Sequence, residues 1–336
     1  MREFLKGMRL EPKGQNLSKI QDMTCAGGNE PLISVVIPTF NRPELLKKAL
    51  NSALAQSYKN LEIIVTDDGA DDGAYEICKA ANDVRVKYFK NSAHTKSPNG
   101  NKNNGFDNVT GEFVCLLDDD DELYEGAIKE CFECLNGGYA CVFADAICEK
   151  DGVITGKVAG RSPYAQSGEM SKIDYHCGRI SGEFFKLFSR EFIENFRFDE
   201  QSFGGENELY IRFFEKRVFY FKKPLYIYRI ARADSATVNA SKHAKSVAYA
   251  YLKTADLCRE IASVHAPGFL ALQYKNAAYY AKMAGEYKMM YRAIFKSLSV
   301  KVSKEAVVFL LLSPLPSSVL PILSRLRVRI KQRFKI

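Results

Sequence analysis

Several features that would define other protein classes are scarce or missing in this sequence. The nine cysteines lack the even, close spacing of a disulfide framework, and no signal peptide opens the chain. Both observations predict a reducing, cytoplasmic setting. The four histidines form no pattern that assigns any of them a catalytic role. A strongly apolar stretch over residues 307–323 contains Pro314, Pro316 and Pro321, so it is too short and too interrupted to predict a membrane-spanning helix.

Two of the cysteines, Cys131 and Cys134, form a Cys-x-x-Cys pair, and Cys141 and Cys148 lie downstream. A zinc site is one interpretation of this spacing. The first two fall on an expected helix and Cys141 in an expected strand, which favours the alternative that they are small core residues.

The net charge of +8 is unevenly distributed, because residues 325–335 hold six basic residues and no acidic one. A nucleic-acid binder needs basic residues interleaved with aromatic ones on one face, and this tail does not show that pattern. No nucleic-acid partner is therefore expected. Since the apolar stretch 307–323 precedes the basic residues, the combination predicts an amphipathic anchor on an anionic membrane surface. The alternative is a C-terminal helix that docks on the protein's own core.

Strand and helix patterns divide the chain into parts. Residues 1–30 are polar without a sustained period and predict a flexible leader. Strands are expected over residues 33–37, 61–65, 84–89, 113–117 and 139–144, and helices over residues 44–56, 73–81, 102–109 and 125–136. This alternation predicts the α/β class, with right-handed βαβ units and a largely parallel sheet. Residues 145–240 are more irregular, and residues 241–300 are mostly helical.

Four consecutive carboxylates, Asp118 to Asp121, follow the apolar run that ends at Leu117. Open α/β sheets bind ligands at the carboxyl ends of their strands. Four like charges repel one another there unless a counter-ion is supplied, and Mg²⁺ or Mn²⁺ takes oxygen ligands of this kind. The alternative is an acidic loop that caps the next helix.

Polar segments also follow the first two expected strands. Pro38 to Arg42 follows the first strand, and Thr66 to Gly69 follows the second. Because all three segments come directly after apolar strands, they are expected at one edge of the sheet. A carboxylate there accepts a hydrogen bond from a base or a ribose hydroxyl, and Phe40 can stack on a base. The set predicts a nucleotide site.

These segments, in this order and spacing, resemble those of the family-two inverting glycosyltransferases, over roughly residues 32–235. The resemblance rests on Ser34–Arg42, on Ala55–Tyr58 with Glu62–Gly69, on Asn101–Gly105 and on Gly111–Asp121. The last segment is similar to the strand that carries the DxD motif. The resemblance implies a GT-A fold, a Rossmann-like sheet with flanking helices, in a glycosyltransferase domain over residues 31–240. Its nucleotide-binding half would span residues 31–145 and its acceptor half residues 146–240, followed by a helical extension over residues 241–336 that ends in the membrane-associating tail.

The resemblance also implies roles for residues at matched positions. The implied nucleotide-sugar-binding residues are Pro38, Thr39, Phe40, Arg42, Asp68, Lys102, Asp118 and Asp119. Asp68 would bind the base, normally uracil, and Lys102, at the family's usual Arg position, would either reach a phosphate or cover the site. Asp120, with Asp118, would hold Mn²⁺ or Mg²⁺. Asp121 is expected to cap the following helix.

The general base of the family is normally the Asp of a Glu-Asp pair that precedes a helix. Counted back from Arg212, that position holds Glu206, and Gly205 replaces the usual Glu. Glu206 is therefore the expected catalytic residue. Glu208 is the second candidate for the base. The alternative is that Glu206 only begins a helix and that Glu208 lies on the exposed face of that helix. Further along, Ala231 replaces the family's usual His, which leaves Arg229 or Arg232 to contact the diphosphate.

The expected function is a metal-dependent, inverting transfer of a sugar from a nucleotide-diphosphate donor, most simply a UDP-sugar, to a hydroxyl of a glycan or lipid-linked acceptor. The resemblance and the tail together imply surface polysaccharide or lipopolysaccharide synthesis at the cytoplasmic face of the inner membrane. Two alternative functions are considered. A sugar nucleotidyltransferase would need a Gly-rich basic loop where Pro38–Arg42 stands. A non-catalytic nucleotide-sugar or glycan-binding protein of the same fold is the other, kept open by the substitution at Gly205 and Glu206.

Overall fold

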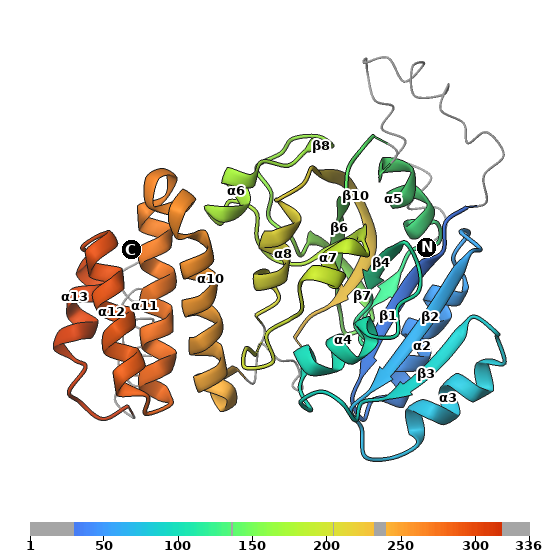
Figure 1. Ribbon diagram of the computed structural model, residues 1–336, viewed down its shortest axis with the longest axis horizontal. Helices are drawn as coiled ribbons and strands as arrows, with labels where there is room; N and C mark the ends of the chain where they lie inside the picture. The colour runs from blue at the N-terminus through green and yellow to red at the C-terminus, as the bar shows by residue number, and fades with distance from the viewer. Residues whose placement is uncertain (1–29, 136, 204, 232–239, 318–336) are drawn as a thin grey trace. The chain divides into compact units, whose positions relative to one another are not determined.

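The computed structural model describes residues 30–317 except residues 136, 204 and 232–239 (Figure 1). Residues 1–29 of the expected leader and residues 318–336 of the expected membrane tail lie outside the described residues, and so does Arg232.

One mixed sheet runs through the first two thirds of the chain, in the order β3-β2-β1-β4-β9-β6-β10-β5, with β7 paired to β6 and β8 to β10. Its strands are β1 (Ile33–Thr39), β2 (Leu61–Asp67), β3 (Val86–Lys90), β4 (Phe113–Leu116), β5 (Glu122–Leu123), β6 (Cys141–Lys150), β7 (Val153–Val158), β8 (Gly168–Glu169), β9 (Phe184–Ser189) and β10 (Val218–Arg229). The β1–β4 block is parallel, as predicted. β9 then enters antiparallel between β4 and β6, so the strand expected over 139–144 does not lie beside β4.

The helices of the sheet region cover both of its faces. They are α2 (Pro43–Leu54), α3 (Gly73–Ala81), α4 (Pro98–Phe106), α5 (Ala127–Leu135), α6 (Lys172–His176), α7 (Glu191–Asn195) and α8 (Asn207–Phe213). The helix predicted over 73–81 matches α3 in both of its bounds. The other predicted helices are displaced by one to four residues, the largest shift being that of α4, where Pro98 supplies a favourable first turn.

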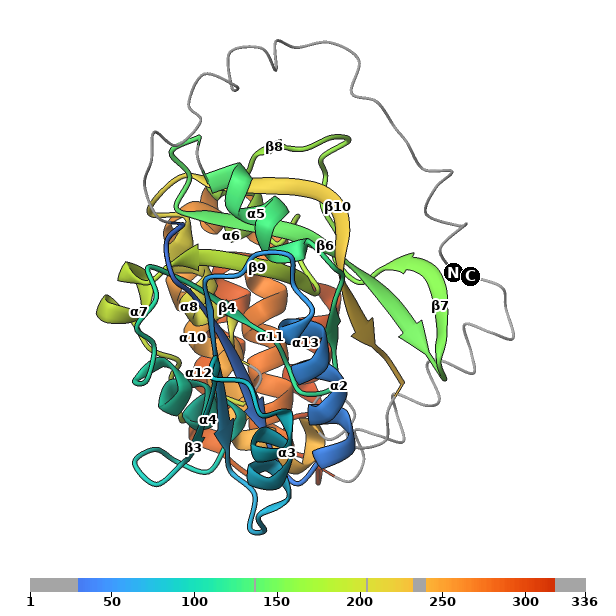
Figure 2. The same ribbon diagram turned by 90° about the vertical axis from the view of Figure 1, so that its right-hand side faces the viewer.

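Alternation along β1 explains why both faces are covered. Ile33, Val35 and Ile37 belong to one buried cluster, together with residues of α2 and α5. Val36 belongs to a second cluster, with residues of α4 and α8 such as Phe106. Successive strand residues point to opposite faces, so a strand that is buried throughout needs a helical layer on each side. Figure 2 shows that the β6–β7 hairpin, in contrast, extends away from these layers.

Four further helices follow a short 3₁₀ turn (η3, Ala240–His243): α10 (Ala244–His265), α11 (Pro267–Met283), α12 (Tyr287–Val300) and α13 (Lys304–Leu311). They share a third buried cluster, rich in alanine, which also includes Ile211 of α8. Small residues let the helices approach closely, and Ile211 joins the extension to the helix that carries Glu206. None of the helices that the structure describes has the combination of length and apolar character that a membrane crossing requires.

Candidate active site

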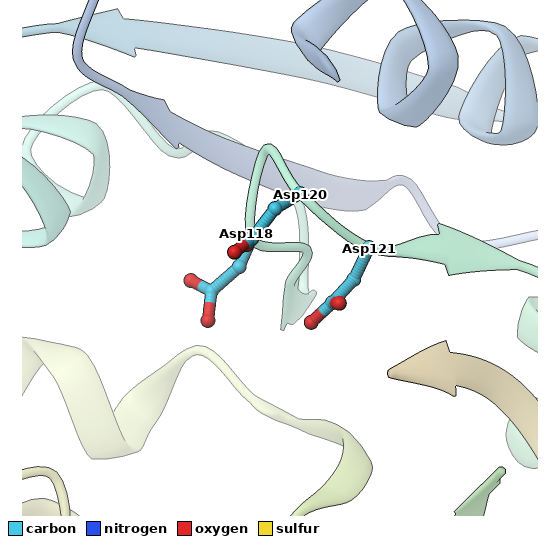
Figure 3. Close-up of side chains that lie close together, drawn as sticks. All are labelled: Asp118, Asp120 and Asp121. Carbon is cyan, nitrogen blue, oxygen red and sulfur yellow. The ribbon is translucent and has the colours of Figure 1, made fainter. Parts of the chain in front are cut away.

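The acidic loop leaves the carboxyl end of β4 and turns sharply, with the backbone N–H of Asp121 donating to the carbonyl of Asp118 at 3.0 Å. Figure 3 shows the side chains of Asp118, Asp120 and Asp121 on the same side of this turn. One oxygen from each of these carboxylates lies within 4.8 Å of the other two. Asp118 and Asp120 are partly exposed, whereas Asp121 is buried.

Asp121 does not cap the following helix, contrary to the prediction. Its carboxylate accepts hydrogen bonds from the Tyr226 hydroxyl at 2.8 Å and from the backbone N–H of Arg229 at 2.9 Å. The strand β5 follows directly, and α5 begins only at Ala127. Asp121 therefore joins the acidic loop to β10. Burial raises the pKa of Asp121 well above its ordinary value, and the neighbouring Asp120 and Asp118 raise it further.

Asp119 points to the loop that follows β1. It accepts a hydrogen bond from the Thr39 hydroxyl at 2.7 Å and pairs with the Arg42 guanidinium at 2.9 Å. Arg42 also reaches Asp120 at 3.5 Å. Burial raises the pKa of Asp119 to about 7, although the charge of Arg42 and the Thr39 hydrogen bond act to lower it. The β1 and β4 ends, 80 residues apart in the chain, thus form one unit.

The donor set of the acidic loop fits a hard divalent cation. Asp118 and Asp120 present carboxylate oxygens on the open side, and Asp121 stands behind them. Hard cations such as Mg²⁺ and Mn²⁺ prefer oxygen ligands. Burial is the main cause of the raised pKa of Asp121, and the charges of Asp120 and Asp118 add to it. A cation would relieve this repulsion between the carboxylates. Asp118 and Asp120 could hold such a cation, and their role as ligands stays a prediction, whereas the buried Asp119 bonds to Thr39 and Arg42.

The predicted base pocket lies at the ends of β1 and β2. The backbone N–H of Asp68 donates to the carbonyl of Thr39 at 3.1 Å, which brings the two segments together. The Asp68 carboxylate accepts a hydrogen bond from the Asn91 amide at 2.6 Å, and burial raises its pKa. Pro38 is buried within β1, while Phe40 is 55% exposed and presents a free ring for stacking. Their roles in nucleotide binding remain predictions.

Helix α4 carries buried asparagine side chains whose amides donate hydrogen bonds to the segments around the site. Asn101 donates to the carbonyls of Thr39 at 2.9 Å and Thr66 at 3.1 Å, which holds the ends of β1 and β2. On another side of the helix, Asn99 and Asn103 are one turn apart and donate to backbone carbonyls of the 198–202 segment. Residues four apart on a helix share one face, so this short helix couples the β1–β2 edge to the segment that precedes α8. The Asn101–Gly105 motif covers part of α4, but nothing in its pattern indicated this role of the asparagines.

Glu206 lies at the N-terminal end of α8, and its carboxylate contacts the Lys102 ammonium. The same ammonium lies 3.2 Å from Asp118. Burial acts to lower the pKa of Lys102, but the charges of Asp118 and Glu206 outweigh it and raise the pKa above its ordinary value. The predicted base, the predicted metal ligand and the predicted phosphate-contacting lysine therefore meet at one point.

Glu208 does not lie on an exposed face of α8. It is 6% exposed, contacts the Ser202 hydroxyl and pairs with Lys253 of α10 at 3.0 Å. Burial raises its pKa, against the opposing effect of Ser202 and Lys253. A Cβ at Gly205 would lie 2.7 Å from the Cβ of Ser202 and 2.9 Å from a carboxylate oxygen of Glu208. A larger residue at position 205 would therefore require Ser202 or Glu208 to shift.

A pocket opens between the acidic loop, α4, α8 and β9. Its lining residues are Lys102, Leu116, Asp118, Glu183, Phe184, Lys186, Phe188, Glu206, Tyr210 and Tyr226. Glu183 and Lys186 were not predicted as site residues, because they lie in the irregular segment 145–240, which has no readable period. The signal present in the sequence is the charge of Lys186 within the aromatic run Phe184 to Phe188.

Arg229 is occupied by the protein itself. Its guanidinium forms ion pairs with Glu122 and with Glu149, the latter at 3.2 Å, and donates a hydrogen bond to the carbonyl of Asp120 at 2.7 Å. Its part in the site is therefore to support the acidic loop, and its predicted diphosphate contact would require breaking these bonds. Ala231, in the position of the family's usual His, has a left-handed backbone with φ of 64°.

Known proteins resemble the chain in sequence and in fold. A model of the family described as Glycosyl transferase family 2 matches residues 34–196. GalNAc(5)-diNAcBac-PP-undecaprenol beta-1,3-glucosyltransferase of Campylobacter jejuni subsp. jejuni serotype O:2 is 42% identical over 304 residues, which cover 89% of this chain and 98% of that protein.

Solved structures of two other proteins share the fold. TarS 1-349 of S. aureus in complex with UDP-GlcNAc has a TM-score of 0.56 at 13% identity, over 78% of this chain and 88% of that one. The mannosyltransferase PcManGT of Pyrobaculum calidifontis, in complex with GDP-Man and Mn²⁺, has a TM-score of 0.51 at 16% identity, over 84% and 79%. At such identities the two structures show the likeness of fold alone.

Proposed function

The chain belongs to glycosyl transferase family 2, and from this premise we propose that it transfers a sugar with inversion from a UDP-sugar to a hydroxyl of a lipid-linked glycan. The observation that carries the proposal is the meeting of Glu206, Lys102 and Asp118 in one pocket. A carboxylate that lines a pocket can accept the proton of an acceptor hydroxyl, which is the task of a general base.

In this mechanism Glu206 removes the proton of the acceptor hydroxyl, whose oxygen attacks the anomeric carbon from the face opposite the diphosphate. Lys102 contacts Glu206 and lies beside Asp118 on the donor side. A divalent cation held by Asp118 and Asp120 would supply positive charge to the departing nucleoside diphosphate. Arg42 and Thr39 keep the acidic loop in place through Asp119.

The donor half is assigned to residues 31–145, with Asp68 against the base and Pro38, Thr39 and Phe40 around it. UDP-glucose is the first donor to test, because the Campylobacter relative is named a glucosyltransferase and the TarS structure holds UDP-GlcNAc. The acceptor half is assigned to residues 146–240, which contribute Glu206 and the β9 side of the pocket. The acceptor named for the Campylobacter relative is linked to undecaprenol diphosphate, which supports a lipid-linked acceptor here.

A lipid-linked acceptor requires access to a membrane surface, and we assign this contact to the helical extension, residues 241–336. On α12 the aromatic side chains of Tyr287 and Phe295 are 51% and 57% exposed, beside the exposed basic residues Lys288 and Arg292. Leu311 on α13 is 73% exposed. Apolar side chains flanked by cations suit the headgroup boundary of an anionic bilayer. The enzyme would then act as a peripheral protein at the cytoplasmic face.

The experiment that tests the proposal is UDP release from UDP-glucose and other nucleotide sugars with Mn²⁺, in the presence of bacterial membrane lipid. We expect turnover with one UDP-sugar, and a loss of about 10²- to 10⁴-fold in kcat for Glu206→Gln. Asp120→Asn should lose activity and weaken the dependence on Mn²⁺. Glu208→Gln is the matched control, because this carboxylate bonds Ser202 and Lys253, so its loss should lower Tm and spare kcat. Activity that survives Glu206→Gln but not Glu208→Gln would contradict the assignment of the base.

A further inference from the structure

Glu183 is a pocket residue that none of the family motifs in the sequence covers. It lies at the turn into β9 and lines the same pocket as Glu206 and as Asp118 of the acidic loop. One of its carboxylate oxygens, Oε1, accepts hydrogen bonds from Lys186 at 3.0 Å and from the backbone N–H of Phe184 at 3.2 Å. The side chain keeps 27% of its surface exposed. It is thus anchored through one oxygen while part of its carboxylate faces the pocket.

The turn that carries Glu183 is built to hold it in place. Gly182 has a φ of 91°, and a Cβ there would collide with the carbonyl oxygen of Ala159. The adjacent bridge joins Arg161 and Ser181 through two backbone hydrogen bonds, of 2.7 and 3.0 Å. A non-glycine residue is strained in this backbone region. The glycine turn and the backbone bridge together fix the main chain from which the Glu183 side chain extends.

Lys186, which pairs with Glu183, is also fixed by its surroundings. Its side chain is 8% exposed, and its ammonium lies 4.3 Å from the ring centre of Tyr210 and 5.6 Å from that of Phe143. Tyr210 in turn lies with its hydroxyl 3.5 Å from Glu206. The pocket therefore contains two Glu–Lys pairs, Glu206 with Lys102 and Glu183 with Lys186, joined through the ring of Tyr210.

We propose that Glu183 binds the acceptor glycan, accepting a hydrogen bond from a sugar hydroxyl other than the one that Glu206 deprotonates. This inference rests on the proposed function. A carboxylate attracts hydroxyl donors and repels a diphosphate, which favours the acceptor over the nucleotide. Glu183 precedes β9, which β4 separates from β1 and β2 in the sheet, whereas the Thr39 and Asp68 segments of the predicted base pocket lie at the ends of β1 and β2. Two carboxylates that each hold one acceptor hydroxyl define which hydroxyl is attacked, so Glu183 is a determinant of linkage position.

The test uses the full chain with UDP-glucose and the lipid-linked glycan named for the Campylobacter relative, GalNAc(5)-diNAcBac-PP-undecaprenol. For Glu183→Ala we expect an acceptor KM raised by about 10- to 100-fold, because a hydrogen bond to a charged group is lost. The KM for UDP-glucose and kcat at saturating acceptor should stay within about threefold of wild type. Glu183→Gln should lie between the two. Glu194→Gln, an exposed carboxylate paired with Arg190, is the matched control and should change nothing.

Several outcomes would overturn the inference. An unchanged acceptor KM with a lowered Tm would make Glu183 only the counter-ion of Lys186. A raised KM for UDP-glucose alone would place the residue at the donor sugar, and a loss of kcat equal to that of Glu206→Gln would make it part of the base. If the wild type turns over no donor, the proposed function fails. The inference is then decided by NMR titration of the UDP-loaded protein with the delipidated glycan, and it is overturned if wild type and Glu183→Ala bind that glycan equally or not at all.

Discussion

Lys102 shows how much a single side chain decides in this site. Its side chain is 6% exposed and shared between the carboxylates of Glu206 and Asp118. A buried ammonium is stable only when it is paired with negative charge. The sequence placed Lys102 at a motif position and left its role open. The structure, which brings it to Glu206 from 104 residues away, makes it the partner of the proposed base.

We predict that Lys102→Met lowers kcat/KM by about 10- to 100-fold, because the Glu206 carboxylate loses the charged contact that positions it in the pocket. Lys102→Arg, which restores the family's usual residue and keeps the positive charge, should retain most of the activity. The measurement is kcat/KM of all three proteins with the same donor and acceptor. An unchanged kcat/KM in Lys102→Met would show that Lys102 does not position the base.

At the scale of elements, α4 depends on close contact with the sheet. A Cβ at Gly105 would collide with Val36 of β1 and lie 3.1 Å from Thr66 Cγ2 of β2. Although alanine is the better helix former, added volume in a packed interface forces the backbone to shift. We therefore predict that Gly105→Ala lowers the free energy of unfolding by about 1 to 3 kcal/mol, measured by urea denaturation. Gly168→Ala, where no atom lies within 4 Å of the added Cβ, should have little effect. Equal stability of both variants would contradict the close packing.

A second link between elements depends on pH. His94 contacts Glu200 at 2.6 Å and Asp107 at 2.8 Å, and so joins the segment after β3 to the segment before α8. Burial acts to lower the pKa of His94, but the two carboxylates outweigh it and raise the pKa. Burial acts to raise the pKa of Glu200, but its hydrogen bonds outweigh burial and lower the pKa to about 2.

The sign of the pH effect follows from these two shifts. A raised pKa of His94 stabilises the fold fully below its unfolded pKa and ceases to do so as the pH rises through the folded pKa, whereas the contribution of Glu200 is present above its unfolded pKa. Both are complete between about pH 5 and pH 6. We predict that His94→Gln lowers the free energy of unfolding by about 1 to 2 kcal/mol at pH 6 and by less at pH 9. An equal loss at both values in urea denaturation would show that His94 contributes without its charge.

At the scale of the whole molecule, the proposed division of tasks gives membrane contact to the helical extension and sugar transfer to the sheet region. We predict that the full chain sediments with vesicles of phosphatidylglycerol, less with neutral phosphatidylcholine, and less at high salt. The double change Lys288→Glu and Arg292→Glu on α12 should weaken vesicle binding by about tenfold or more, since each basic residue near an anionic surface contributes about 1 kcal/mol. Lys47→Glu with Lys48→Glu on α2 is the control of equal charge. If both pairs weaken binding equally, net charge and not this face governs the association.

Local pattern alone determined the parts of the molecule whose neighbours in space are also neighbours in sequence. The β-branched apolar run predicted β1, and a spacing of about four residues predicted the helix over Gly73–Ala81. The acidic loop after β4 could be predicted from its four consecutive carboxylates. The three strand ends could also be placed at one edge, because parallel strands end on the same side.

Contacts between residues far apart in the chain were decided only by the tertiary structure. The insertion of β9 between β4 and β6 brings Glu183 into the pocket, and the packing of α10 against α8 buries Glu208 beside Lys253. Asp121 accepts hydrogen bonds from residues of β10, although the sequence predicted that it caps a helix. The physical reason is that a side chain's protonation and exposure depend on whatever lies within a few ångströms in space, and strand order, which no local period encodes, selects those neighbours.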